Sequence, residues 1–238
     1  MAQVTAGTAT IDAAGLETRE VNRAIKRSIA DGVAEIRVIH PAGRHSLGVA
    51  LKADGVRVVF DGPVGWYAAG MNHGPTVVVE GSAGWAIGEC MMGGRIEVHG
   101  FAGSGAAASI RGGLVFVGGD TGARAGIAMK GGTLIVAGSV GYMTGFMMQK
   151  GTIIVCGDAA DGLGDSLYDG TIYVGGRIAS RGADAEIEET TDEDRKVLAA
   201  ALGEFGLDAG MPDFTKIRSG RKLWNFSSKE PELWASAL

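Results

Sequence analysis

Glycine recurs every 19 residues through the middle of the chain. Two apolar columns keep the same step, one beginning at Val58 and the other at Phe60. Residues two apart lie on one face of a β-strand, so each repeat carries a short strand with one apolar side. A fixed period of this size predicts a solenoid, in which each repeat covers the apolar face of its neighbour. The recurring glycines are Gly62, Gly81, Gly100, Gly119, Gly138, Gly157 and Gly176.

The length of the repeat indicates which class of solenoid the chain forms. Helical repeats need longer units, and the leucine and asparagine pattern of leucine-rich repeats is absent from the sequence. A unit of 19 residues with one strand and a further apolar segment fits one coil of a parallel β-helix. The sequence therefore predicts an all-β fold, a right-handed parallel β-helix solenoid of about seven coils. The predicted parts are an N-terminal cap and irregular first coil (1–55), the β-helix repeats (56–180) and a C-terminal helix plus extended arm (181–238).

Further glycines complete the pattern G-x-x-G-x-x-x-G in several repeats. Glycine inside a strand costs about 0.5–1 kcal/mol relative to alanine, so 41 glycines indicate corners where the backbone needs positive φ or a close approach. We expect valine at Gly138 to destabilise the chain because such a corner requires positive φ. The three complete patterns are formed by Gly81, Gly84 and Gly88, by Gly119, Gly122 and Gly126, and by Gly138, Gly141 and Gly145.

Both ends of the repeat carry cap signals. Residues 17–30 have the apolar spacing of an amphipathic helix, with Gly32 just past its end. After an acidic run, Thr191 and Asp194 have the spacing of a capping box that opens a short helix. The segment 211–238 is too apolar for a simply disordered tail. We interpret it as an arm that packs either on its own solenoid or on another chain.

Composition excludes several function classes. A net charge of −5 argues against nucleic-acid binding, which needs a basic surface. No apolar run approaches the length of a membrane span, and the N-terminus lacks a signal-peptide pattern, so a cytoplasmic location is expected. The two cysteines, Cys90 and Cys156, fall about half a circuit apart around the coil, which disfavours a disulfide or a shared metal site. No cofactor is expected in this chain.

The candidate contact residues fall into three groups. His73, Arg111 and Lys130 share a column, with Lys150 beside it, and predict an outward basic strip that is either simply solvated or meets an acidic partner surface or anionic ligand. A second column holds Trp66, Trp85 and Tyr142, whose rings either point into the core or anchor an interface. The arm adds Trp224, Phe226 and Trp234.

The chain offers little for catalysis. Paired carboxylates would suggest a polysaccharide enzyme, but only Asp120 and Asp158 share a column, and they are two coils apart. Asp161, Asp165 and Asp169 belong to one coil, where they fit turn positions. We therefore expect no catalytic residues, and an independent carbohydrate-active β-helix is retained only as a third hypothesis.

The glycine pattern, together with strands such as those of residues 132–138 and 151–157, resembles the C-terminal β-helix domain of the large subunit of glutamate synthase. The resemblance covers about residues 17–180 and includes Val21, Asn22 and Arg23. In that family the domain is a scaffold between a glutaminase-type domain and a flavin-bearing synthase domain. A related domain forms the β-helix subunit of formylmethanofuran dehydrogenase, which supplies the second hypothesis.

The chain departs from glutamate synthase because it has neither catalytic domain, and residue 2 is alanine rather than a cysteine nucleophile. Within the family it is most similar to stand-alone β-helix subunits of the N-methylglutamate synthase type. The resemblance implies a scaffold for two partners, a glutaminase-like (class II amidotransferase) subunit and a flavin-dependent glutamate-synthase-like subunit. It also implies that FMN and an iron–sulfur cluster reside in those partners, and that the complex uses methylamine and glutamate.

Overall fold

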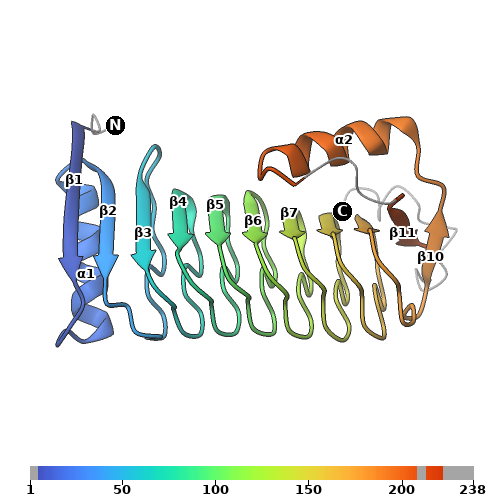
Figure 1. Cartoon of the computed structure of the whole chain (residues 1–238), viewed down its shortest axis with the longest axis horizontal. Coiled ribbons are helices and arrows are strands. Elements are labelled where there is room, and N and C mark those ends of the chain that lie inside the picture. The colour runs from blue at the N-terminus through green and yellow to red at the C-terminus, as the bar shows by residue number, and fades with distance from the viewer. Residues whose placement is uncertain (1–4, 208–212, 222–238) are drawn as a thin grey trace, which may run out of the picture.

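The computed structural model describes residues 5–207 and 213–221, and its architecture is the expected parallel β-helix (Figure 1). Within these ranges eleven strands form one sheet in the order β1-β2-β3-β4-β5-β6-β7-β8-β9-β11-β10. The parallel strands are β1 (Thr5–Asp12), β2 (Val33–Ile39), β3 (Arg57–Asp61), β4 (His73–Val79), β5 (Gly93–Val98), β6 (Leu114–Val117), β7 (Lys130–Val136), β8 (Lys150–Val155) and β9 (Thr171–Val174). The remaining elements are α1 (Thr18–Ala30), β10 (Ala185–Glu188), α2 (Asp192–Gly203) and β11 (Thr215–Ser219).

Residues that are 19 positions apart in the sequence stack on one another in successive coils. Val58 pairs with Val77, Val77 with Ile96, and the same register continues one coil at a time to Ile172 in β9. These side chains point inward and are fully buried, as are those of the column that starts at Phe60. The core is therefore a stack of branched apolar side chains that runs the length of the solenoid.

Two columns of corner glycines are required by close approach of the backbone. In the first, the N–H of each glycine from Gly100 onward donates to the carbonyl of the glycine one coil earlier, as from Gly119 to Gly100 (2.9 Å) and from Gly138 to Gly119 (3.1 Å). A Cβ atom on Gly138 would lie 2.8 Å from the carbonyl carbon and oxygen of Gly119. In the second column, a Cβ atom on Gly141 would lie 2.7 Å from the carbonyl carbon of Gly122.

Positive φ, the reason expected for glycine at Gly138, was therefore wrong, whereas at Gly84 the close approach, one of the two expected reasons, is confirmed. Neither residue has positive φ. A Cβ atom on Gly84 would lie 2.8 Å from the carbonyl carbon of Gly65, so glycine stands at these positions because two coils touch. Positive φ is confirmed instead for Gly62 (135°) and for the third column, which holds Gly88 (71°), Gly126 (66°) and Gly145 (72°).

That third column belongs to a second wall in which every other residue is left-handed. Tyr67, Ala69 and Met71 have φ of 59°, 52° and 56°, and the same alternation recurs in each coil. Their N–H groups donate alternately to the next and the preceding coil, as from Tyr67 to Trp85 (2.8 Å) and from Ala69 to Leu47 (2.8 Å). We call this surface the left-handed wall; it comprises residues 46–50, 67–71, 86–90, 105–109, 124–128, 143–147 and 162–166.

The N-terminal end is closed by the predicted helix and by an unpredicted strand. Helix α1 buries Val21 and Ile25 in the core, and Glu17 and Glu20 form a capping box at its start. Strand β1 then adds a parallel edge outside β2. Strand β1 could not be predicted because its threonine and alanine residues lack a strong apolar alternation.

A single asparagine ties α1 to the first coil. The Asn22 amide donates to the Ser46 carbonyl (2.8 Å) and accepts from the Gly48 N–H (2.8 Å). Both contacts lie at the start of the left-handed wall. The helix is therefore fixed to the same wall that carries the candidate site.

The C-terminal end is closed by the chain folding back. Strand β11 pairs antiparallel with both β9 and β10, so the described part of the arm packs on its own solenoid. The predicted capping box of Thr191 and Asp194 is confirmed at the start of α2. Trp224, Phe226 and Trp234 lie outside the described residues.

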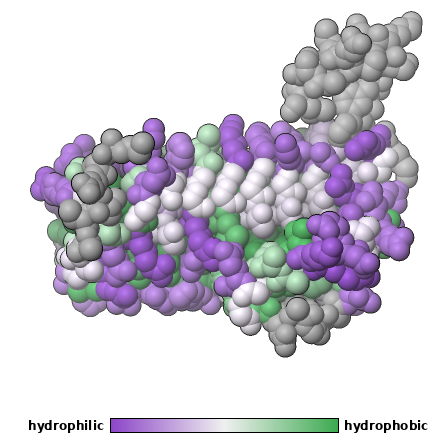
Figure 2. Space-filling view, turned by 90° about the horizontal axis from the view of Figure 1, so that it is seen from above, coloured by the Kyte–Doolittle hydropathy of each residue, from purple (hydrophilic) through white to green (hydrophobic). Residues whose placement is uncertain are grey.

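Helix α2 covers the outer face of the strand wall from β6 to β9, where hydrophobic surface gathers beside it (Figures 1 and 2). Leu198 and Leu202 are buried there, and Phe205 stacks on Phe116 with ring centroids 3.9 Å apart. The outward residues of these strands that form this second core are Phe116, Ile135, Ile154 and Tyr173. In the part of the chain that the structure describes, no helix is long and apolar enough to cross a membrane.

Asp194 anchors α2 to the solenoid. Its carboxylate accepts hydrogen bonds from the Tyr173 hydroxyl (2.6 Å) and from the Lys216 Nζ (3.0 Å). Burial opposes ionisation, but the hydrogen bonds from Tyr173, Thr191 and Lys216 prevail and hold the pKa of Asp194 well below its usual range. Burial and the Asp194 carboxylate together raise the pKa of Tyr173, so the phenol remains a hydrogen-bond donor.

We predict that Gly138→Val destabilises the protein by roughly 3 kcal/mol, because the new side chain would overlap the Gly119 backbone. Thermal unfolding followed by circular dichroism measures the effect. Gly203→Ala is the matched control, since a Cβ atom there meets nothing within 4 Å. A melting temperature of the valine variant equal to that of the parent would contradict the close approach.

We predict that Asp194→Asn lowers stability by about 1–2 kcal/mol near neutral pH, because the charge that faces Lys216 is lost. A carboxyl group with a depressed native pKa stabilises fully above its unfolded value and stops contributing as pH falls through the native one. The difference in melting temperature between parent and variant should therefore stay constant down to about pH 4 and shrink below it. A difference that instead grows in acid would show that Asp194 is not the anchor.

Candidate functional site

A ladder of stacked rings stands on the surface of the solenoid beside the left-handed wall. His45 stacks on Trp66 with centroids 4.6 Å apart, and Trp66 stacks on Trp85 at 5.1 Å. Trp66 is 44% exposed and Trp85 is 55% exposed, so the interpretation that places these indoles in the core is excluded. We call His45, Trp66 and Trp85 the aromatic ladder.

Other large apolar side chains are exposed on the same and neighbouring columns. With the ladder they form what we call the aromatic–methionine surface. Exposed apolar patches of this kind mark interaction sites, tryptophan and tyrosine dominate interface energetics, and methionine adapts to irregular partners. The additional members are Tyr142 in the tryptophan column and Tyr67, Met71 and Met147 on the left-handed wall.

Some of these side chains occupy unfavourable backbone positions. Tyr67 and Met71 are left-handed, a conformation that costs an L-residue roughly 1–2 kcal/mol. The next two coils place Ala86 and Gly105 at the position of Tyr67, so the fold itself does not require a bulky residue there. Because Tyr67 remains 48% exposed, its ring gains little burial within the described chain. The ring is therefore suited to contacts outside the chain.

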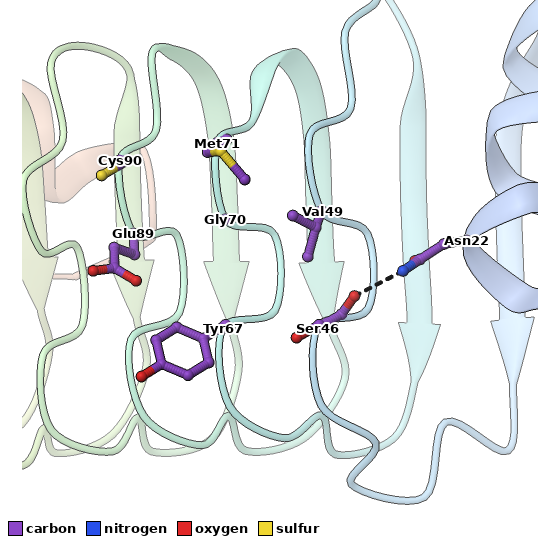
Figure 3. A pocket seen from close by; sticks show the side chains of 8 residues that line it. All are labelled: Asn22, Ser46, Val49, Tyr67, Gly70, Met71, Glu89 and Cys90. Carbon is purple, nitrogen blue, oxygen red and sulfur yellow. Dashed lines mark hydrogen bonds between the residues drawn. The ribbon is translucent and has the colours of Figure 1, made fainter. Parts of the chain in front are cut away.

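A pocket of about 490 Å³ opens on the left-handed wall next to α1. Figure 3 shows its side chains projecting from neighbouring coils in front of the strands. Asn22 contributes from α1, but its amide already bonds Ser46 and Gly48. The lining residues are Asn22, Ser46, Val49, Tyr67, Gly70, Met71, Glu89 and Cys90. Sequence reasoning missed this pocket, since its walls come from different coils.

The predicted basic strip lies at the surface, at the N-terminal ends of the strands. His73, Arg111 and Lys150 are exposed, and Lys130 is half-buried with its Nζ near the Ala128 carbonyl (3.3 Å). Lys130 and Lys150 are register partners in β7 and β8, so like charges stand on adjacent coils. Within residues 5–207 and 213–221 none of these four side chains forms an ion pair.

Lys52 extends this strip by one coil. It forms a parallel bridge with His73, which places it beside the histidine on the preceding coil. Its position lies in the irregular first coil, where counting in fixed steps along the sequence is unreliable, and for that reason the sequence pattern did not include it.

The aspartates considered for catalysis are bound to neighbouring segments. Asp120 accepts from the Ser139 N–H (2.7 Å) and Asp158 from the Arg177 N–H (2.8 Å), in each case one coil onward. Asp161 accepts from the Ser180 hydroxyl (2.8 Å). The remaining two carboxylates are held by Ser166 and Ala183 (Asp165) and by Arg218 (Asp169). Their geometry is that of groups that hold the stack together.

The two cysteines are free thiols in different surroundings. Cys156 lies beneath α2, and burial raises its pKa to about 11, so it remains a protonated, unreactive thiol. Cys90 lines the pocket. Among the described residues no group of three or more His, Cys, Asp or Glu side chains is arranged to hold a metal ion.

The described chain is a parallel β-helix that exposes aromatic and methionine side chains on one part of its surface and basic side chains on another. No known family model matches the chain, and no curated protein matches it.

We predict that Trp85→Ala costs only about 0.5–1.5 kcal/mol, the worth of one aromatic stack, because the indole is already solvated on one side. Phe60→Ala should cost roughly 3–5 kcal/mol, since Phe60 is fully buried. Thermal unfolding of the two variants measures this contrast. An equal loss of stability in the two variants would show that Trp85 is a core residue.

Proposed function

We propose that this chain is a non-catalytic scaffold subunit of a glutamate-synthase-like complex of the N-methylglutamate synthase type. It holds a glutaminase-like (class II amidotransferase) subunit and a flavin-dependent glutamate-synthase-like subunit, and the FMN and iron–sulfur cluster belong to those partners. The assembly is cytoplasmic. The observation that carries the proposal is the aromatic–methionine surface, which exposes two stacked indoles on a rigid solenoid.

Rigidity supports the scaffold role. Backbone hydrogen bonds join successive coils at the strands, at the corner glycines and along the left-handed wall. Such a solenoid keeps two bound proteins at a fixed separation and orientation, which an enzyme that passes an intermediate between subunits requires.

Two unlike surfaces support two partners. The aromatic–methionine surface suits an apolar partner face, and the basic strip of His73, Arg111, Lys130 and Lys150 suits an acidic one. The glycine pattern supports this family over other solenoids. The equivalent role in a formylmethanofuran dehydrogenase would be distinguished by molybdenum or tungsten subunits among the captured proteins.

We predict that affinity capture of the tagged chain from native cell extract recovers a protein with flavin absorbance together with an amidotransferase-like chain. The double variant Trp66→Ala/Trp85→Ala should reduce that recovery at least about tenfold, because truncation of interface tryptophans typically costs about 2 kcal/mol or more. Ile187→Ala, 60% exposed on β10, is the matched control and should bind normally. A parent chain that captures neither protein would refute the scaffold proposal.

A further inference from the structure

The pocket beside the aromatic ladder contains one carboxylate without a counter-ion. Glu89 is half-buried, and its side chain makes no ion pair or side-chain hydrogen bond with any residue in 5–207 or 213–221. The same pocket is lined by the ring of Tyr67 and the thioether of Met71 from the preceding coil and by Val49 one coil further away (Figure 3). None of the eight lining residues is basic. The pocket therefore combines one acidic group with apolar walls.

This arrangement favours a cationic occupant. A carboxylate partly removed from water is stabilised by a charge-assisted hydrogen bond, which is about twice as strong as a neutral one. The exposed Tyr67 ring adds a cation–π contact. A guanidinium group matches both partners, since it pairs with a carboxylate through two parallel N–H groups and stacks on aromatic faces.

The pocket is open to solvent and borders the exposed rings of the aromatic ladder. Both features favour the side chain of a partner protein as its occupant. Ser46 follows His45, and Tyr67 follows Trp66, so the pocket borders the aromatic ladder directly. A free amine in an open pocket would keep much of its hydration. An arginine held by a partner that also packs on the indoles would lose far less freedom on binding.

We propose that this pocket receives an arginine side chain of a partner protein, which pairs with Glu89 while apolar residues next to that arginine pack on Trp66 and Trp85. The inference rests on the proposed function, because the arginine belongs to one of the two partner subunits. Arginine and tryptophan are the residue types that most often dominate interface energies.

The pocket is tested first without any partner. The full chain is labelled with methyl-¹³C methionine and titrated with Nα-acetyl-arginine amide, using Nα-acetyl-citrulline amide as the neutral isostere. The Met71 methyl resonance should shift with the arginine compound, at least about fivefold less with the citrulline compound, and likewise less in Glu89→Gln. The Met147 resonance, from the same column several coils away, is the internal control. Equal shifts with both compounds, or in parent and variant, would overturn the inference.

The second arm uses the complex. Glu89→Gln should weaken capture of the partner about tenfold or more and reduce its salt dependence, while Glu193→Gln on exposed α2 should change neither. Parent-like capture by Glu89→Gln would overturn this inference and leave the scaffold proposal intact. If the parent captures no partner, the scaffold proposal fails, and the methionine titration alone decides whether the pocket binds guanidinium groups.

Discussion

Hydrogen bonding between successive coils is the constraint on which the structure depends. The coils must approach to the distance of paired strands around their whole circumference, including the corners. At the corners a side chain would occupy the space that the preceding backbone already fills, as Gly138 and Gly119 demonstrate. Glycine at these positions lets the backbone close on itself, and the apolar columns of the core follow from the same register.

Much of the fold could be predicted because the repeat is strict, and the columns that begin at Val58 and Phe60 became the core. The physical reason for Gly138 could not be predicted, since glycine serves positive φ and close contact equally well. The left-handed wall could not be predicted because residue types such as that of Tyr67 do not indicate a left-handed backbone.

The candidate site was even harder to predict from the sequence than the fold. The direction of the tryptophan column depends on backbone turns that periodicity does not encode, and the pocket at Glu89 depends on side chains from several coils and on α1.

The polar side chains divide into those that hold the stack and those left unpaired. Asp120 and Asp158 bond the next coil, and Asp194 fastens α2 over the strand wall. Glu89 and the basic strip form no ion pair among the described residues, and of the strip only Lys130 donates a side-chain hydrogen bond, to the Ala128 carbonyl. Acidic and basic groups are thus presented on different columns of one solenoid.

Because the coils are near-identical in length, the number of coils between two surface features sets their distance along the solenoid axis. Loss or gain of one whole repeat between the aromatic ladder and α2 would translate these two features relative to each other by about 4.8 Å along the axis, with each coil's local geometry preserved. The distance between two surface features of such a solenoid can therefore change in fixed increments, without redesign of either feature.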